Sequence, residues 1–523
     1  MTRNSFRNNY SNYKLFLFYI ILWILVLIGI PAYLYSLYGF GIKLHFDEWV
    51  GRGLYPGLAL ANGADLYEPQ RGPHITLYGA GSALFYSPTA LSSSPQGAIW
   101  LGYSLNILGL ICGVGYLLYQ VLSSVYKELH KKMLATMGCL IIVSSVFVIE
   151  PTTEGVFRIH ADFPAFFFLI TGLCFFQAYI KNNSNLFLWI TCIFLCLSVW
   201  AKLPTLPAII FPVVYFILQK KYKEAVLFLP RLLVVSGLIS FSFFCLYGFN
   251  DTMFILFDHV QKANSWGIRN TLFHGNNTWV AMSYLEAIPL LFRYLVMYLA
   301  EYWYIILISL VSSIGAYRFR KNIPHASILI NFSIIYFLTL PPGLVALAHY
   351  GSVENALLFA NTSGILIFLF SLLILCSVKF RPNLFIILIW TFAILFTLPF
   401  LRLAKSSPSE IQTAPQQQAF RYLQSGKKDV YFGWYPISHL MHSGVALTSI
   451  EAPIHLNETL PDDFNFSSKH FPSGARYLAT GPAGYGSHVL QYYLGKLTEK
   501  PSPPELSSWR LYELSDRKDE TDE

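Results

Sequence analysis

Long apolar segments follow one another along most of this chain, separated by short polar connections. A helix needs about 20 predominantly apolar residues to cross a bilayer. The first stretch, about Leu15 to Tyr38, is too long for a signal-peptide core and predicts a retained span. The pattern predicts an all-α polytopic membrane protein of about eleven transmembrane helices, near residues 15–37, 97–120, 134–150, 162–180, 185–200, 204–219, 225–247, 299–317, 325–347, 355–378 and 382–401.

Composition and charge support the same class. Of the 523 residues, 54% are hydrophobic and only 12% are charged, whereas soluble domains carry about 25% charged residues. The net charge of +8 does not indicate a nucleic-acid partner, because the basic residues form short clusters between apolar segments. All seven cysteines lie in apolar segments, which favours packing over metal or redox chemistry.

The basic clusters also predict the orientation, because lysine and arginine are enriched in cytoplasmic connections. All these clusters fall on the cytoplasmic side only if residues 280–317 cross the membrane once. In that case an interfacial amphipathic helix precedes the crossing. The N-terminus is then cytoplasmic and the C-terminus lies outside an inner (plasma) membrane. The clusters contain Arg3, Arg7 and Lys14; Lys127, Lys131 and Lys132; Lys181; Lys220, Lys221 and Lys223; Arg318, Arg320 and Lys321; and Lys379 and Arg381.

Four regions are predicted on the outer face: 38–96, about 150–162, 248–280 and the chain from about 402. The last contains three strand-like segments, Asp429–Gly433, Arg476–Ala479 and Trp509–Glu513. We therefore expect a transmembrane domain over 1–401 with interfacial helices in its outer loops. A small α/β module over 402–515 and a disordered charged tail over 516–523 follow it.

Two adjacent carboxylates, Asp47 and Glu48, follow the first span. Charged groups at a membrane boundary are costly unless they are solvated, paired or used. One interpretation is an interfacial charge pair at a helix end, and the other is a catalytic site. The next outer loop holds glycine and proline beside aromatic residues, Tyr78 among them, which indicates an ordered and functional loop.

A second polar motif, Arg158-Ile-His160-Ala-Asp162-Phe-Pro164, stands at the mouth of the fourth predicted span. Asp162 is either a helix cap, with Pro164 in the first turn, or a cavity-facing group, and the two roles are compatible. Lys202, beside Pro204, favours a tight reversal between two spans on the predicted outer side. Its ammonium either reaches back to the interface or binds a phosphate.

The outer region 248–280 is rich in aromatic and hydrogen-bonding side chains. His259, Trp266, Arg269 and His274 are of the types that a sugar or a lipid head group requires. A solvated loop with an aromatic anchor at the interface is the alternative. No Walker loop, dinucleotide fingerprint, HExxH motif or zinc-ligand spacing occurs in the sequence.

This layout resembles the GT-C superfamily of integral membrane glycosyltransferases, which includes protein mannosyltransferases and the aminoarabinose transferases of lipid A. The Asp47-Glu48 pair matches the position of the family's acidic motif. The Leu60–Tyr67 and Tyr78–Gly81 segments resemble a loop of bacterial members, and His160-Ala-Asp162 and Trp200-Ala-Lys202 fall where such proteins place a second acidic site and an outer lysine. The chain lacks a clear Lys-Pro-Pro in the first outer loop, and this leaves the donor sugar open.

The resemblance implies transfer of a sugar from a polyprenyl-phosphate carrier to a lipid, glycan or protein acceptor, in the synthesis of envelope glycans or glycolipids. Asp47 would be the catalytic base, with Glu48 and Asp162 in support. Lys202, Arg158 or Arg269 would stabilise the leaving phosphate, and His160, Tyr78, His259, Trp266 and His274 would contact substrate. Some relatives need Mg²⁺ or Mn²⁺, for which Asp47 and Asp162 would be the ligands.

Two other functions fit a multispanning chain. An envelope polysaccharide polymerase or ligase relies on arginines of the outer loops more than on an acidic pair. A transporter of lipid-linked sugars tends to carry charged or broken helices near the midplane. Because the charges of this chain sit at the ends of the predicted spans, transport is the less favoured of the two.

Overall fold

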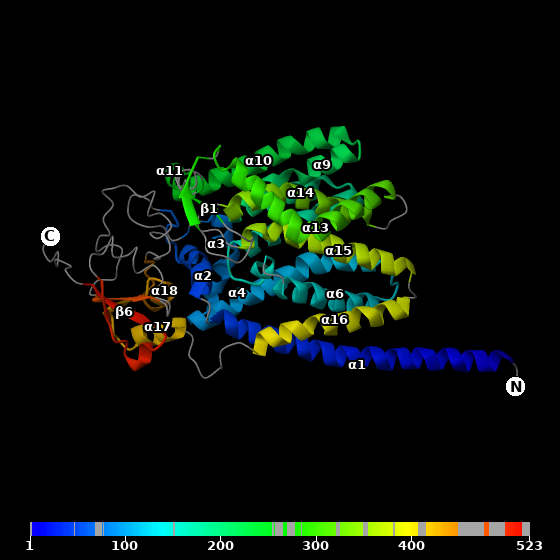
Figure 1. Ribbon diagram of the computed structural model, residues 1–523, viewed down its shortest axis with the longest axis horizontal. Coiled ribbons are helices and arrows are strands. Elements are labelled where there is room, and N and C mark those ends of the chain that lie inside the picture. The colour runs from blue at the N-terminus through cyan, green and yellow to red at the C-terminus, as the bar shows by residue number, and fades with distance from the viewer. Residues whose placement is uncertain are drawn as a thin grey trace.

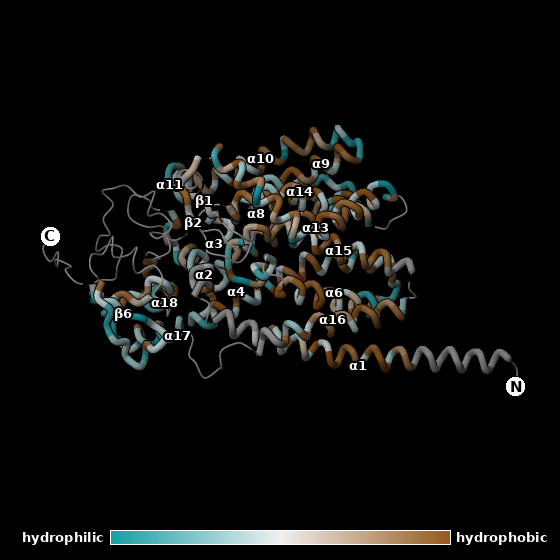
Figure 2. The backbone as a smooth tube through the Cα atoms, in the orientation of Figure 1, coloured by the Kyte–Doolittle hydropathy of each residue, from teal (hydrophilic) through white to brown (hydrophobic). Residues whose placement is uncertain are grey.

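Helices that are long and apolar enough to cross a membrane dominate the computed structural model. It describes residues 3–45, 48–67, 76, 78–149, 152–253, 256, 265–268, 278–283, 285–320, 325–348, 354–379, 382–405, 415–447, 475–480 and 497–514. Within these residues, nine helices are long and apolar enough to cross a membrane, so the chain is a multi-pass membrane protein. They lie side by side as one bundle whose long segments are apolar (Figures 1 and 2).

The nine spanning helices present apolar side chains to their surroundings. Large apolar side chains on their outer faces, such as Leu27 and Leu233, are exposed, as expected where lipid is the solvent. The helices are α1 (Arg3–His45), α4 and α5 (Pro95–Leu110 and Tyr116–Leu122, joined by one π-helical turn, Ile111–Gly115), α6 (Leu129–Ile149), α7 (Asp162–Asn182), α10 (Tyr222–Tyr247), α13 (Ile288–Arg318), α14 (Ala326–Ala348), α15 (Leu358–Lys379) and α16 (Pro382–Lys405).

Two shorter apolar segments lie between α7 and α10. The first is α8 (Asn185–Ala201), and the second joins a 3-10 helix, η4 (Leu203–Ile210), to α9 (Phe211–Leu218). Lys202 separates them in an extended conformation, with φ −154° and ψ 121°. The predicted break at Lys202 is therefore confirmed, and Pro204 explains it, because proline has no N–H to continue the helix.

The segment over 280–317 contains one candidate spanning helix, α13, made of two helical parts that meet at a kink. A turn at 285–287 leads into α13, which is 31 residues long. Its backbone leaves the helical region only at Tyr302, with φ −117° and ψ 19°. The part before the kink corresponds to the predicted amphipathic helix, and its Tyr294 and Tyr298 side chains are already buried in the bundle.

Short elements cover one end of the bundle, the end that faces the C-terminal module in Figure 1. Among them, α2 and α3 are largely buried. The elements are α2 (Glu48–Ala61), α3 (Ala80–Tyr86), η1 (Ser87–Leu91), η3 (Glu154–Val156), α11 (Phe249–Met253), the antiparallel pair β1 and β2 (Ser265–Ile268 and Thr278–Ala281) and η6 (Glu354–Leu357).

The C-terminal module is built on a four-stranded sheet of order β3-β4-β6-β5, in which only β3 and β4 are parallel. Three of its strands match the three predicted segments. The fourth, Leu497–Lys500, escaped prediction because it has two charged residues and buries only Leu497. The elements are α17 (Pro415–Gln424), β3 (Val430–Tyr431), α18 (Ile437–Ser443), β4 (Tyr477–Thr480), β5 (Leu497–Lys500), η8 (Pro504–Leu506) and β6 (Arg510–Leu514).

The module is fastened to the bundle through α2. The hydroxyl of Tyr55 donates a hydrogen bond to the carbonyl of Leu447, and both groups are buried. Inside the module, Nε2 of His439 accepts the N–H of Phe432 at 3.0 Å. Burial lowers the pKa of His439 to about 4, so the ring is neutral at pH 7 and keeps this acceptor role.

Two glycines allow α2 and α3 to pack directly on backbone at this end. A Cβ atom at Gly79, which precedes α3, would overlap the carbonyl oxygen of Trp200 near the end of α8. A Cβ atom at Gly53 in α2 would overlap the carbonyl oxygen of Ile159, just before α7. These close contacts fix the loops that carry Tyr78, His160 and Lys202.

Replacement of Gly79 by alanine is expected to destabilise the protein by about 3 kcal/mol, because backbone must move to admit the methyl group. Thermal unfolding of the purified full-length protein in detergent measures this. Gly237→Ala in α10 is the matched control, since a Cβ atom there meets no atom within 4 Å. Equal stability of the two variants would contradict the close packing at Gly79.

Candidate functional site

A buried carboxylate, that of Asp162, lies at the centre of the candidate site. Ala161 occupies the capping position of α7 and Asp162 is its first helical residue. Pro164 is accommodated in this first turn, where the backbone N–H groups have no partner within the helix. The Asp162 side chain is only 1% exposed, and a charge at such depth requires partners.

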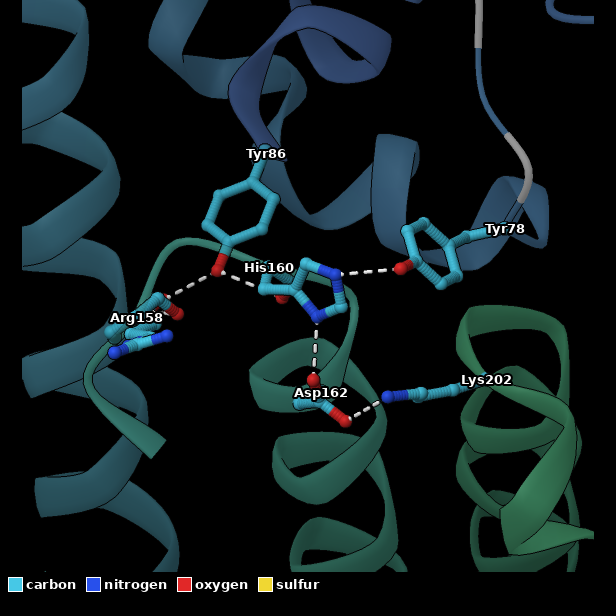
Figure 3. Close-up of polar contacts among 7 residues, drawn as sticks. Tyr78, Tyr86, Arg158, His160, Asp162 and Lys202 are labelled. Carbon is cyan, nitrogen blue, oxygen red and sulfur yellow. Dashed lines mark hydrogen bonds and ion pairs between the residues drawn. The ribbon is translucent and has the colours of Figure 1, made fainter. Parts of the chain in front are cut away.

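Two partners come from different parts of the chain (Figure 3). The Lys202 ammonium forms an ion pair with Oδ1 of Asp162. Nδ1 of His160 lies 2.5 Å from Oδ2 of the same carboxylate. Asp162 therefore balances the charge of one lysine and orients one imidazole.

Tyr78 extends the cluster toward the outer loops. Its hydroxyl lies 2.7 Å from Nε2 of His160, and the two rings meet edge to face at 4.7 Å. An ionised carboxylate only accepts hydrogen bonds, so Nδ1 of His160 carries a proton. In the neutral ring, Nε2 then accepts the hydroxyl proton of Tyr78. The result is a continuous hydrogen-bonded chain, Asp162–His160–Tyr78.

The short segment that carries His160 is held by two residues that the sequence did not single out. Nδ2 of Asn106 donates to the carbonyl of Arg158 at 3.1 Å, and the hydroxyl of Tyr86 donates to Oδ1 of Asn106 at 2.9 Å. Burial raises the pKa of Tyr86 well above its ordinary value, so the hydroxyl stays a donor. Asn106 is a buried amide in an apolar span. A polar residue in such a segment is the sequence signal that could have identified it as a candidate.

Lys202 is fixed by the chain on both sides of it. The hydroxyl of Ser198, one turn earlier in α8, donates to the carbonyl of Ala165 in α7 at 2.8 Å. The hydroxyl of Thr205 donates to the carbonyl of Lys202 at 2.9 Å. The Lys202 side chain is 14% exposed, and its Nζ lies 5.9 Å from the ring centre of Tyr78.

The other predicted site residues are not part of the Asp162 cluster as the structure describes it. Arg158 points away from Asp162, and its guanidinium pairs with Glu154 at 2.5 Å, so it does not join the cluster. Trp266 is buried in β1, and its indole N–H donates to the carbonyl of Met282 at 2.9 Å, which favours a packing role. Glu48 begins α2, but its side chain lies outside the described residues, as do Asp47, His259, Arg269 and His274 entirely.

Asp162 fits poorly as the metal ligand that the family resemblance implies. Its two oxygens are engaged by Lys202 and His160, and an adjacent ammonium repels a cation. Within the described part of the chain, no group of three or more His, Cys, Asp or Glu side chains is placed to hold a metal ion. We therefore derive no step through a metal.

Chemically, the cluster offers hydrogen-bond donors beside a positive charge. Lysine carries three N–H donors, and one of those of Lys202 is directed at Asp162. The side chains of Lys202, His160 and Tyr78 are partly exposed at the end of the bundle. Because the protons of His160 and Tyr78 are donated within the cluster, the N–H groups of Lys202 are the donors that suit an anion with oxygen acceptors, and the Asp162 carboxylate sets the position of this ammonium.

Comparison with known proteins assigns the chain to no family. No protein-family model matches the sequence, and searches of curated proteins and of solved structures found no match.

Lys202→Met should destabilise the protein by about 3 kcal/mol, because it leaves the Asp162 carboxylate buried without its counter-charge. The double variant Asp162→Asn/Lys202→Met should recover much of this loss, since it removes both charges together. Unfolding of the four proteins of this cycle in detergent measures the coupling. Additive losses in the double variant would show that the two side chains do not interact.

Proposed function

We propose that this protein is a glycosyltransferase of the membrane, which moves a sugar from a polyprenyl-phosphate carrier to an acceptor hydroxyl. The observation that carries the proposal is the cluster of Lys202, His160 and Tyr78 around the buried Asp162. It is partly exposed at the end of an apolar bundle, where the phosphate of a lipid-anchored donor would lie while its chain remains in the bilayer.

The reaction needs one base and one site for the leaving group. The acceptor oxygen forms a bond to the anomeric carbon, the bond from that carbon to the phosphate oxygen breaks, and the acceptor proton passes to a carboxylate. We assign the base to Asp47, because both Asp162 oxygens are already engaged. Polyprenyl phosphate leaves with one more negative charge, which the Lys202 ammonium would stabilise.

The position of the charges supports transfer over the alternatives. The Asp162–Lys202 pair lies at the starts and ends of helices, not at the middle of α7 or α8, whereas transporter sites lie near the midplane. A polymerase or ligase would require free arginines in the outer loops, and Arg158, the one outer-loop arginine of the transmembrane domain whose side chain the structure describes, is paired with Glu154.

The proposal includes eleven crossings, in which α8 and the η4–α9 unit are the two short ones. The basic end of the bundle then faces the cytoplasm, and the Asp162 cluster and the C-terminal module lie outside. The module contacts α2 beside the cluster, which favours a role at the entrance for the acceptor.

Lys202→Gln should lower kcat for sugar transfer by about 100-fold, the usual effect of losing one donor to a developing anion. Asp47→Asn should abolish transfer. A mass measurement of the acceptor, after incubation of the purified protein with a mixture of polyprenyl-phosphate sugars, tests both variants and identifies the sugar.

Lys132→Gln is the matched control, because it removes an ammonium from the opposite, basic end of the bundle and should leave kcat unchanged. Each variant is first compared with the parent protein for thermal stability, since Lys202 is also structural. Full transfer by folded Lys202→Gln and Asp47→Asn proteins would rule out this assignment of the site.

A further inference from the structure

An apolar cavity lies at the basic end of the bundle. Its volume is about 560 Å³, and it lies between the end of α9, the last turns of α13 and the first half of α14. Several lining side chains, including Leu218, Ile314 and Phe337, are exposed on the outer surface of the bundle. The cavity thus opens toward the lipid. Its apolar wall is formed by Val214, Leu218, Ile314, Ile334, Phe337 and Leu338.

This cavity is separate from the Asp162 cluster. The η4–α9 unit begins beside Lys202 and ends at Leu218, and its eight 3-10 and eight α residues span up to roughly 28 Å. Figure 1 shows α9 directed toward the end of the bundle away from the C-terminal module. Occupancy of this cavity therefore involves none of the groups that we assign to sugar transfer.

The cavity wall offers little to a polar ligand. Three hydroxyl-bearing side chains line it, and each hydroxyl donates to a backbone carbonyl. Ser313 donates to Ser309 and Ser333 donates to Leu329 within their own helices, and Tyr317 donates to Leu218 of α9. A sugar or a peptide needs hydrogen-bonding groups that converge on it, whereas a hydrocarbon chain needs only apolar walls.

The rim is cationic. Arg318 lines the cavity and forms no ion pair with an acidic residue of the described chain. Lys220 and Lys221 follow α9 directly and are exposed. Arg320 stands over the ring of Tyr317 at 4.7 Å, and the Tyr317 hydroxyl donates to the carbonyl of Leu218 at 3.1 Å. This contact braces α13 against α9 and sets the basic groups around the opening.

We propose that this cavity binds an anionic phospholipid, with one acyl chain between α9, α13 and α14 and the phosphate against Arg318. An apolar slot between spanning helices with arginine and lysine at the level of the head groups matches the two parts of such a lipid. The bound chain would fill the gap between α9 and the α13–α14 pair and so hold the unit that leads to Lys202 in place.

Native mass spectrometry of the purified full-length protein tests this proposal without any measurement of activity. The delipidated protein is titrated with phosphatidylglycerol and, separately, with phosphatidylcholine of the same acyl chains. The parent protein should retain one phosphatidylglycerol more tightly than any phosphatidylcholine. Arg318→Gln should weaken that site by about fivefold, the effect of one basic residue on an anionic lipid.

Ser333→Phe, which fills the cavity from α14, should abolish the site, and Lys132→Gln, a basic residue of the same end but on α6, should leave it intact. Equal retention of the two lipids, or no effect of Arg318→Gln in a protein of unchanged thermal stability, would overturn the proposal. Selective retention of polyprenyl phosphate over phosphatidylglycerol would also overturn it, by assigning the cavity to the carrier.

Discussion

The buried carboxylate of Asp162 is the constraint on which the end of this bundle depends. A charge that is 1% exposed is tolerated only with a counter-charge and hydrogen-bond donors, so Lys202 and His160 must come to it. Their approach fixes where α7 begins and where α8 ends. Glycine at positions 53 and 79 then lets α2 and α3 pack directly on the backbone of Ile159 and of Trp200, and the loop of Tyr78 is brought into the cluster.

The two ends of the bundle differ in their chemistry. At the Asp162 end, short helices, the β1–β2 pair and the C-terminal module surround a cluster of hydrogen-bonded polar groups. At the other end, basic residues border an apolar cavity that opens toward lipid. The η4–α9 unit connects the two ends, so the same segment follows Lys202 and lines the apolar cavity.

Much of the bundle could be predicted from the sequence because a spanning helix is a local property of about 20 residues. The break at Lys202 was likewise local, since Pro204 stands beside it. His160 and Asp162 are two residues apart, so their proximity could be predicted from the sequence. Their contacts with Lys202 and Tyr78 join distant parts of the chain and could not be predicted. The support from Asn106 to the Arg158 carbonyl was not predictable, because an amide in an apolar segment does not reveal its partner.

We propose that the Asp162 cluster holds the phosphate of the donor. Electron cryo-microscopy of the protein in lipid nanodiscs with added polyprenyl phosphate would locate that phosphate. We expect it within hydrogen-bonding distance of Nζ of Lys202, with Asp162 still on the opposite side of that ammonium. A phosphate that binds only at the basic end, or a Lys202 ammonium sealed from the outer surface, would contradict it.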